Sequence, residues 1–293
     1  MLQGKLFSEL GSIEADPFST QLLKWIGNKQ RFAHEIIGVF PQTFNNYYEP
    51  FLGSGAVLSV LSPKSAYASD AFGPLIDIFK ALKNDPSTLK KWYEERWLLA
   101  NGAERKEGYE QIKASFNRKQ NGADFVYLCR ACYGGVIRFR KADGYMSTPC
   151  GAHDPINPKS FNKRVDLWYE RVKNTEFHHC EYGDAMRKAK KGDLIYCDPP
   201  YVHSQAILYG GQLFKLEELF NEIALCKKRG VFVVLSIDGT KKSGDMLLDL
   251  PIPKGLFEQE IYVNIGKSML KRFQMSGKTL ENELVTDRLL LTY

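Results

Sequence analysis

Short apolar runs alternate along the chain with longer stretches in which apolar residues recur every three to four positions. The short runs predict seven strands, at residues 45–49, 65–69, 176–181, 194–197, 231–236, 257–264 and 288–293. Helices are predicted after several of these strands, at residues 56–61, 74–83 and 216–229. This alternation predicts an α/β fold with a mostly parallel sheet. No helix of useful length separates the last two strands, so we expect them to form an antiparallel hairpin at one edge of the sheet.

A long connection separates the second predicted strand from the third. Residues 84–175 hold predicted helices at 90–99, 106–117 and 124–131, and an Arg-rich loop with several glycines at 134–151. A connection of this length is more typical of an inserted subdomain than of a loop. We therefore expect a sheet domain made of residues 20–83 and 176–293, and a mainly helical insert made of residues 84–175.

Positive charge is concentrated in the insert. The 293-residue chain is 44% hydrophobic and 25% charged, as in soluble globular proteins, and its net charge is +6. Residues 113–173 contain twelve Lys or Arg against five Asp or Glu, interleaved with aromatic residues. Such a segment suits a polyanionic partner, although the pattern alone is equally compatible with a solvated face.

Two further features bear on where the chain works. Its longest apolar runs, such as residues 231–235, are too short to cross a bilayer. Residues 1–10 lack the basic and then apolar pattern of a signal peptide. We therefore expect a cytoplasmic protein that has no membrane partner.

The six cysteines leave one alternative open. In a cytosolic chain of this size we expect reduced thiols rather than a disulfide framework. Cys129 and Cys132, together with Cys150 and His153, have the spacing of zinc ligands. Cys129 and Cys132 also lie in or beside an apolar stretch, where cysteine behaves as a small hydrophobic residue.

Two glycines and an acid suggest a cofactor that contains a nucleoside. Gly53 and Gly55 lie between a predicted strand and a predicted helix, where bare backbone allows close approach of a ligand. Asp70 ends the next strand, about twenty residues later, where α/β folds place an acid that binds ribose hydroxyls.

A rigid polar turn follows the strand at 194–197. Asp198 is succeeded by Pro199, Pro200 and Tyr201 at the carboxyl end of that strand. Open α/β sheets bind ligands at such ends, and two prolines fix the local backbone. A carboxylate, a backbone carbonyl and an aromatic ring in one turn can hold a planar ring that carries an amino group.

These motifs together resemble those of a known family. The sequence Asp-Pro-Pro-Tyr at 198–201 resembles the catalytic motif of DNA methyltransferases that methylate amino groups. Glu-Pro-Phe-Leu-Gly-Ser-Gly at 49–55 is similar to their S-adenosylmethionine loop. Lys-Trp-Ile-Gly-Asn-Lys at 24–29 resembles the segment that opens the Dam-type (D12 class) adenine-specific family. The order of the motifs also matches, and the resemblance runs from about residue 22 to the C-terminus.

The resemblance implies a Rossmann-like methyltransferase sheet, S-adenosyl-L-methionine as cofactor and no metal. Asp198, Pro199 and Tyr201 would act on the target amine, with Tyr201 stacked on an adenine flipped out of duplex DNA. The resemblance implies a cofactor site made of Trp25, Lys29, Glu49, Phe51, Gly53, Gly55, Asp70, Tyr182, Asp184 and Asp198. Within it, Lys29 is expected near the cofactor carboxylate, and Tyr182 and Asp184 near its adenine.

The resemblance also assigns a DNA-contacting role to part of the insert. The expected contacts to double-stranded DNA are Arg130, Tyr133, Arg138, Arg140 and Lys141. The family's Tyr-Asn-Gly is Tyr133-Gly134-Gly135 here, and Arg140 replaces an Asn, so the GATC specificity of the best-known members is not implied. A cognate restriction endonuclease is a further expected partner, paired through function and not necessarily through contact.

Two other classes of function remain compatible with the sequence. One is a methyltransferase of the same fold that acts on the cytosine amine, on RNA or on a glutamine side chain. Such enzymes more often have Ser or Asn at the position of Asp198. The other is a catalytically silent DNA-binding subunit, against which the intact Asp198, Asp70, Gly53 and Gly55 argue.

Overall fold

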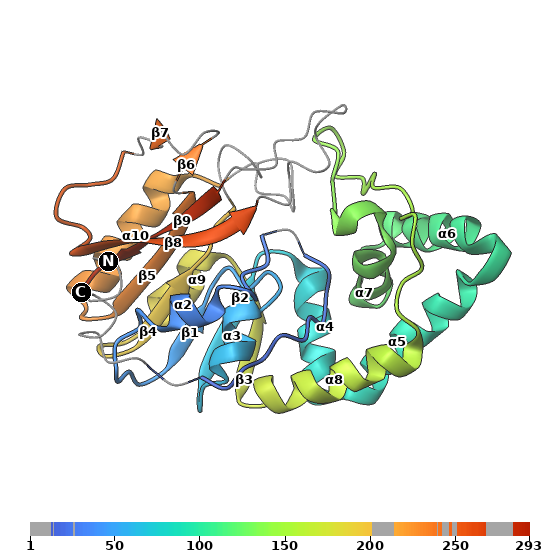
Figure 1. Cartoon of the computed structure of the whole chain (residues 1–293), viewed down its shortest axis with the longest axis horizontal. Helices are drawn as coiled ribbons and strands as arrows, with labels where there is room; N and C mark the ends of the chain where they lie inside the picture. The colour runs from blue at the N-terminus through green and yellow to red at the C-terminus, as the bar shows by residue number, and fades with distance from the viewer. Residues whose placement is uncertain are drawn as a thin grey trace.

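The computed structural model describes residues 13, 15–25, 27–200, 214–238, 240–241, 246–247, 251–267 and 284–293. Its centre is a seven-stranded sheet in the order β3-β2-β1-β4-β5-β9-β8 (Figure 1). In chain order the strands are β1 (Tyr47–Glu49), β2 (Ala66–Asp70), β3 (Thr175–His179), β4 (Leu194–Cys197), β5 (Phe232–Asp238), β8 (Gln259–Lys267) and β9 (Leu284–Leu291). Each lies close to a strand predicted from the sequence.

The strand directions confirm the predicted mixed sheet. Strands β3, β2, β1, β4 and β5 are parallel to one another. Strand β9 is antiparallel to β5, and β8 is antiparallel to β9, so the last two strands form the expected edge hairpin. A separate two-stranded hairpin of β6 (Thr240–Lys241) and β7 (Met246–Leu247) was not predicted.

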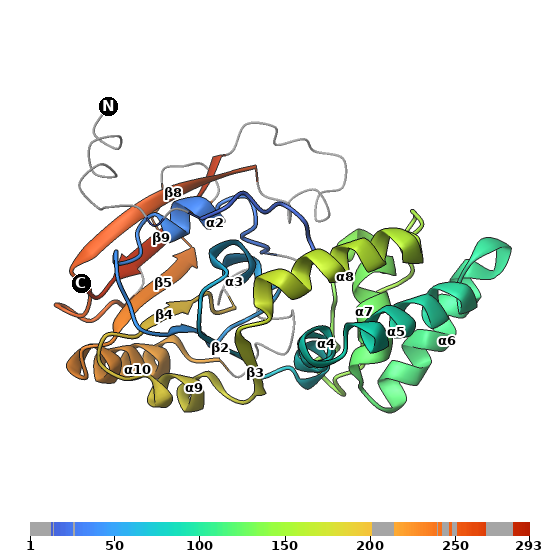
Figure 2. The same cartoon turned by 90° about the horizontal axis from the view of Figure 1, so that it is seen from below.

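Helices cover both faces of the sheet (Figure 2). On one face lie α2 (Ala33–Ile37), α3 (Ala56–Leu61) and α4 (Gly73–Asn84), and on the other lie α9 (Tyr182–Lys188) and α10 (Leu216–Lys228). Strand β4 shows why both faces are apolar. Its Leu194 and Tyr196 join the core on the α3 side, whereas Ile195 and Cys197 join the core on the α10 side.

The insert is helical, as predicted. It contains α5 (Pro86–Leu99), α6 (Arg105–Arg118), α7 (Gly122–Ala131) and α8 (Pro158–Val172), with short 3-10 turns η1 (Gly102–Glu104) and η2 (Tyr133–Gly135). Helix α8 was not predicted. It begins after Asn157, whose side chain accepts a hydrogen bond from the Ser160 backbone N–H, and its buried Phe161, Val165 and Trp168 are three or four residues apart.

The insert shares its core with one face of the sheet domain. Helix α4 packs against α7 and α8, and one continuous apolar cluster extends from the sheet into the insert. A Cβ atom at Gly122 would lie 2.6 Å from Cβ of Asp77, so the start of α7 meets α4 at close range. The division at residues 84 and 175 stays a prediction, because the packing does not stop there.

None of the helices in the described ranges is long and apolar enough to span a bilayer.

Candidate functional site

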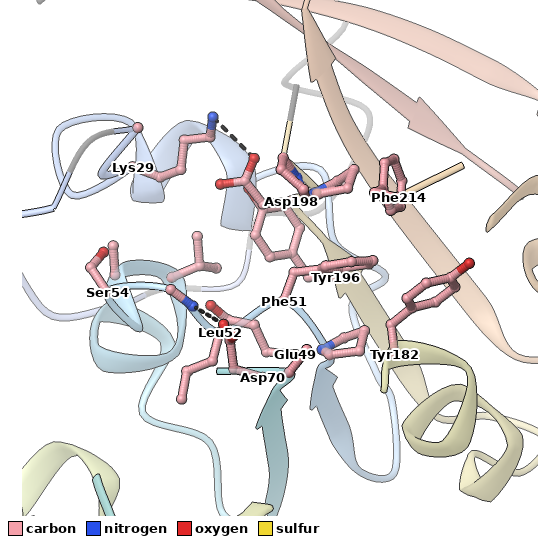
Figure 3. Close-up of a pocket in the computed structure, with 18 of the residues that line it drawn as sticks. Lys29, Glu49, Phe51, Leu52, Ser54, Asp70, Tyr182, Tyr196, Asp198 and Phe214 are labelled. Atoms are coloured by element: carbon pink, nitrogen blue, oxygen red, sulfur yellow. Dashed lines mark hydrogen bonds and ion pairs between the residues drawn. The ribbon is translucent and has the colours of Figure 1, made fainter. Parts of the chain in front are cut away.

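A cavity of about 310 Å³ opens at the carboxyl ends of the central strands (Figure 3). The strand order reverses between β1 and β4, and open α/β sheets bind ligands at such a switch point. Residues that follow β1, β2 and β4 therefore reach the same cavity, although they are far apart in sequence. Of the predicted cofactor residues, Trp25, Lys29, Glu49, Phe51, Gly53, Asp70, Tyr182 and Asp198 line it.

The glycine loop forms one wall with bare backbone. Gly53 and Gly55 have φ angles of 49° and 65°, in the left-handed region that favours glycine. A Cβ atom at Gly53 would lie 3.1 Å from Nε1 of Trp25, which stands over the loop. Gly55 precedes α3 and does not line the cavity itself, so its contribution is to the shape of the turn.

Asp70 ties the end of β2 to this loop. Its carboxylate accepts hydrogen bonds from the backbone N–H of Gly53 (3.0 Å) and of Phe72 (2.9 Å). Burial raises the pKa of the Asp70 carboxyl, while these two hydrogen bonds act in the opposite direction. The acid therefore fixes the loop and lines the cavity at once.

Three aromatic rings form another part of the wall. The Phe51 and Tyr182 rings are stacked, with centroids 5.0 Å apart and planes at 24°. Phe214 meets Phe51 edge-on at 5.9 Å and Tyr182 at 6.0 Å. Phe214 was not predicted, since it lies before α10 with no motif around it. Such a cluster offers apolar faces to a flat aromatic ligand.

Asp198 forms an ion pair within the cavity. Nζ of Lys29 lies 3.1 Å from Oδ1 of Asp198, and the side chains are only 7% and 21% exposed (Figure 3). Lys29, which was expected beside the cofactor carboxylate, thus holds the acid of the Asp-Pro-Pro turn. Pro199 and Pro200 also line the cavity, and Tyr201 lies outside the described residues.

Glu49 is a buried acid at the base of the site. Its side chain accepts a hydrogen bond from the Tyr47 hydroxyl (2.7 Å), and the residue is 3% exposed. Burial raises the pKa of the Glu49 carboxyl to about 8; the Tyr47 hydrogen bond opposes this rise, and the charge of Asp198 adds to it. Near neutral pH this carboxyl is therefore largely protonated.

Asp184 lies apart from the cavity. Its side chain is exposed and forms an ion pair with Arg187 one helical turn later. From the same turn, Glu181 and Tyr182 line the cavity instead. The placement of Asp184 therefore differs from the expected position beside the cofactor.

The predicted DNA-contacting residues divide into two groups. Tyr133 is 49% exposed, and Arg138, Arg140 and Lys141 are also exposed. Arg130, in contrast, is 4% exposed and donates a hydrogen bond to the Leu22 carbonyl (2.7 Å). A guanidinium buried in this way supports the N-terminal segment, and this placement does not fit the expected DNA contact.

Residues 20–25 connect the insert to the cavity. Arg164 of α8 donates to the Gln21 carbonyl (2.8 Å), and the Trp168 indole donates to the Thr20 carbonyl (2.8 Å). With the bond from Arg130, donors of α7 and α8 hold three successive carbonyls. Trp25 then packs edge-on against Phe125 of α7, with ring centroids 6.3 Å apart.

The cysteines do not assemble into a metal site in the part of the chain that the structure describes. There, no group of three or more His, Cys, Asp or Glu side chains could hold a metal ion. Cys129 and Cys132 are buried in the insert core, and burial raises the pKa of both thiols. Here they pack as small apolar side chains.

The cavity fits a nucleoside cofactor that carries charged groups. Bare backbone at Gly53 allows close approach, Asp70 is an acceptor at the end of β2, and the Phe51 and Tyr182 rings can cover a base. Lys29 and Asp198 supply groups of both charge signs on the same cavity.

Comparison with known proteins agrees with these features. The chain is 26% identical over 255 residues to the Type II methyltransferase M1.LlaDCHI of Lactococcus lactis, covering 79% of this chain and 85% of that protein. It is 27% identical over 227 residues to the DNA adenine methylase of Vibrio cholerae, covering 73% and 79%. The DNA N-6-adenine-methyltransferase of Escherichia phage P1 is 25% identical over 248 residues, 80% of this chain and 32% of that protein. The model of one family, described as D12 class N6 adenine-specific DNA methyltransferase, matches residues 25–263. Because this match spans most of the chain, the protein belongs to the D12 class of adenine-specific DNA methyltransferases.

Proposed function

We propose that this enzyme transfers the methyl group of S-adenosyl-L-methionine to the exocyclic amine of an adenine flipped out of duplex DNA at a specific site. The observation that carries the proposal is the convergence of the glycine loop, Asp70, the aromatic wall and Asp198 on one cavity. When bound, the cofactor supplies a methyl group already activated as an electrophile. The protein then has to align an amine with this methyl group, and it does so by positioning the amine and by the charges around it.

Asp198 is the proposed group for activating the amine. The exocyclic amine of adenine is a weak nucleophile, because its lone pair is delocalised into the ring. Hydrogen bonds from its N–H groups to Asp198 and to a backbone carbonyl of the Asp-Pro-Pro turn favour a tetrahedral nitrogen. The ion pair with Lys29 holds the Asp198 carboxylate in place for this task.

In this proposal the cofactor and the target adenine occupy different parts of the cavity. The cofactor lies against the aromatic rings, and the target adenine lies against the Asp-Pro-Pro turn. Phe51 and Tyr182 would cover the adenine ring of the cofactor, and Asp70 would bind its ribose. Pro199 would offer a carbonyl to the target base, and Tyr201 would stack on it. An amine inside a duplex cannot reach a methyl donor in such a cavity, so the base has to leave the stack.

The insert is the proposed target-recognition domain. Exposed Tyr133, Arg138, Arg140 and Lys141 lie between α7 and α8, within the segment that carries the excess positive charge. Arg130 is left out of this interface because it is buried. We expect affinity for duplex DNA to fall by roughly 0.9 log unit per log unit of salt for each phosphate contacted.

Replacing Asp198 by Ala tests the proposal. We expect Asp198→Ala to abolish transfer of a tritiated methyl group to duplex DNA, and Asp198→Asn to retain only a trace. Much of the affinity for duplex DNA should persist in both variants. A role mainly in the transition state lowers kcat with little change in KM.

Asp166→Ala is a matched control, because Asp166 is an exposed aspartate on α8 that does not line the cavity. It should retain full activity. Near-normal turnover in Asp198→Ala would refute the assigned role. A methyl group found on cytosine by mass analysis of the product nucleosides would refute the proposed reaction.

Two further aspects belong to the same proposal. The enzyme would act in the cytoplasm, on cellular DNA, and a cognate restriction endonuclease would recognise the same site. To test this functional pairing, cells that express the chain receive foreign DNA. Foreign DNA that this enzyme has methylated is compared with the same DNA left unmethylated.

A further inference from the structure

An arginine in the loop between η2 and α8 of the insert is already held in one orientation. Between η2 and α8 the chain folds back on itself, with a bridge between Phe139 and Met146. At the tip, the Arg140 backbone N–H donates to the Tyr145 carbonyl (2.9 Å), and the Gly144 N–H donates to the Arg140 carbonyl (2.9 Å). Gly144 has a φ of 65°, which permits the tight return of the chain. We call residues 138–147 the recognition hairpin.

The base of the recognition hairpin is fixed to the insert. Met146 is fully buried, and its backbone N–H and carbonyl bond with the side-chain amide of Asn117 on α6 (2.6 and 3.1 Å). Phe139 is 6% exposed and meets Phe72 with ring centroids 5.5 Å apart. Arg138 and Arg140 alternate with the buried positions, so their side chains are exposed.

Two neighbours orient the guanidinium of Arg140. Its Nε and Nη2 donate to the two carboxylate oxygens of Asp143, at 3.1 and 2.5 Å. Its Cζ lies 4.3 Å from the centroid of the Tyr145 ring. Asp143 is itself fixed, because its Oδ1 also accepts a hydrogen bond from the Tyr145 backbone N–H (3.1 Å). One edge and one face of the guanidinium are therefore occupied within the hairpin.

The arrangement leaves a defined surface for a ligand. A guanidinium has five N–H donors, of which Asp143 takes two. The remaining N–H donors are on Nη1 and Nη2, on the edge of the guanidinium that lies away from Nε. Their spacing matches that of two adjacent hydrogen-bond acceptors. O6 and N7 of guanine are such a pair in the major groove. Because the side chain is held beforehand, less rotamer entropy is lost on binding.

The charge of the pair favours a base over a phosphate. Asp143 compensates the positive charge of Arg140, and the two side chains are 49% and 53% exposed. A net-neutral pair has little long-range attraction for the DNA backbone, and its carboxylate repels a phosphate. A base edge, in contrast, carries no net charge and is recognised by donor geometry.

We propose that Arg140, oriented by Asp143 and Tyr145, reads a guanine in the DNA sequence that the enzyme methylates. This inference rests on the proposed function. It adds a guanine to the recognised sequence and assigns its recognition to Arg140. Asp143 acts as a positioning residue, since it works through Arg140 and does not itself contact the guanine.

Mapping of methylated adenines tests this assignment. Total DNA from an adenine-methylation-free host that expresses each variant is read by single-molecule sequencing. We expect the wild-type site to contain a fixed guanine. In Arg140→Lys, which keeps the charge but loses the fork, preference for guanine at that position should fall by roughly 5- to 150-fold. Asp143→Ala should relax the same position to a smaller extent.

Lys141→Ala is the matched control, since it removes an adjacent exposed charge that no residue of the hairpin orients. It should weaken methylation at all sites alike. An unchanged site in Arg140→Lys would refute the reading of guanine and leave the methyltransferase activity established. Adenine methylation absent from the wild-type sample would refute the proposed function, and this inference with it. A lower melting temperature in Asp143→Ala with an unchanged site would show that Asp143 only stabilises the hairpin.

Discussion

Replacing Glu49 by Gln tests whether one buried carboxyl group makes the stability of this enzyme depend on pH. Burial raises the pKa of Glu49 to about 8 in the folded chain, against 4.5 for an ordinary glutamate. Between these two pH values the unfolded chain ionises Glu49 and the folded chain does not. Gln resembles the protonated carboxyl group in shape and can still accept the hydrogen bond from Tyr47, but it does not titrate.

The size of the effect follows from the two pKa values. A raised pKa means that stability is complete below pH 4.5 and is lost as pH rises toward 8. Each pH unit in this range changes the free energy of unfolding by about 1.4 kcal/mol, so the whole range corresponds to about 5 kcal/mol. Since Glu49 is 3% exposed, solvent screening reduces this value little. Between pH 5.5 and 8 the expected loss is about 3 kcal/mol.

Urea unfolding of wild type and Glu49→Gln at a series of pH values measures this difference. All other titrating groups are common to both proteins and cancel in the comparison. We expect the free energy of unfolding of wild type to fall relative to the variant from pH 5.5 to 8, and the difference to level off above pH 8. Parallel stability profiles over that range would show that Glu49 is ionised in the folded chain, and would refute the argument.

Three further predictions follow from the same region. The proposed cofactor, S-adenosyl-L-methionine, is cationic and should favour ionised Glu49, so wild type should bind it more tightly at pH 8.5 than at pH 6.5, whereas Glu49→Gln should show a flat profile by calorimetry. Gly53→Ala should weaken cofactor binding at least tenfold, since φ is 49° and the new Cβ lies 3.1 Å from the Trp25 indole. Equal affinities of wild type and Gly53→Ala would refute the close approach. Arg130→Met should lower the free energy of unfolding by about 1–3 kcal/mol, because the Leu22 carbonyl loses its donor. An unchanged urea midpoint together with loss of DNA affinity would instead support a direct DNA contact.

The sheet and most of its helices could be predicted because their apolar spacing is regular. Strand β4 and helix α3 have the same bounds in the structure as in the prediction. Helix α8 was missed because its apolar residues are separated by many charged ones, although Asn157 and Pro158 carry the start signal of a helix. The strand order could be anticipated only in part, because it depends on pairing between segments distant in the chain.

The site was predictable where a motif marks it, and obscure where only the fold brings residues together. Gly53, Asp70 and Asp198 stand in motifs and line the cavity. Phe214 stands in no motif and reaches the cavity through the position of α10. Lys29 also stands in a motif and lines the cavity, but its partner Asp198 is 169 positions away, so the ion pair could not be anticipated. Burial of Arg130 likewise depends on the contact between α7 and residues 21–22.

The attachment of residues 20–25 to the insert has a thermodynamic consequence. Donors from α7 and α8 hold this segment on one side, and Trp25 stands over the glycine loop on the other. If α7 moved when the protein bound DNA, residues 20–25 would therefore transmit the movement to the cavity. Linkage requires that such an influence run in both directions. Whatever factor cognate DNA contributes to the affinity for the cofactor, the cofactor must contribute the same factor to the affinity for DNA.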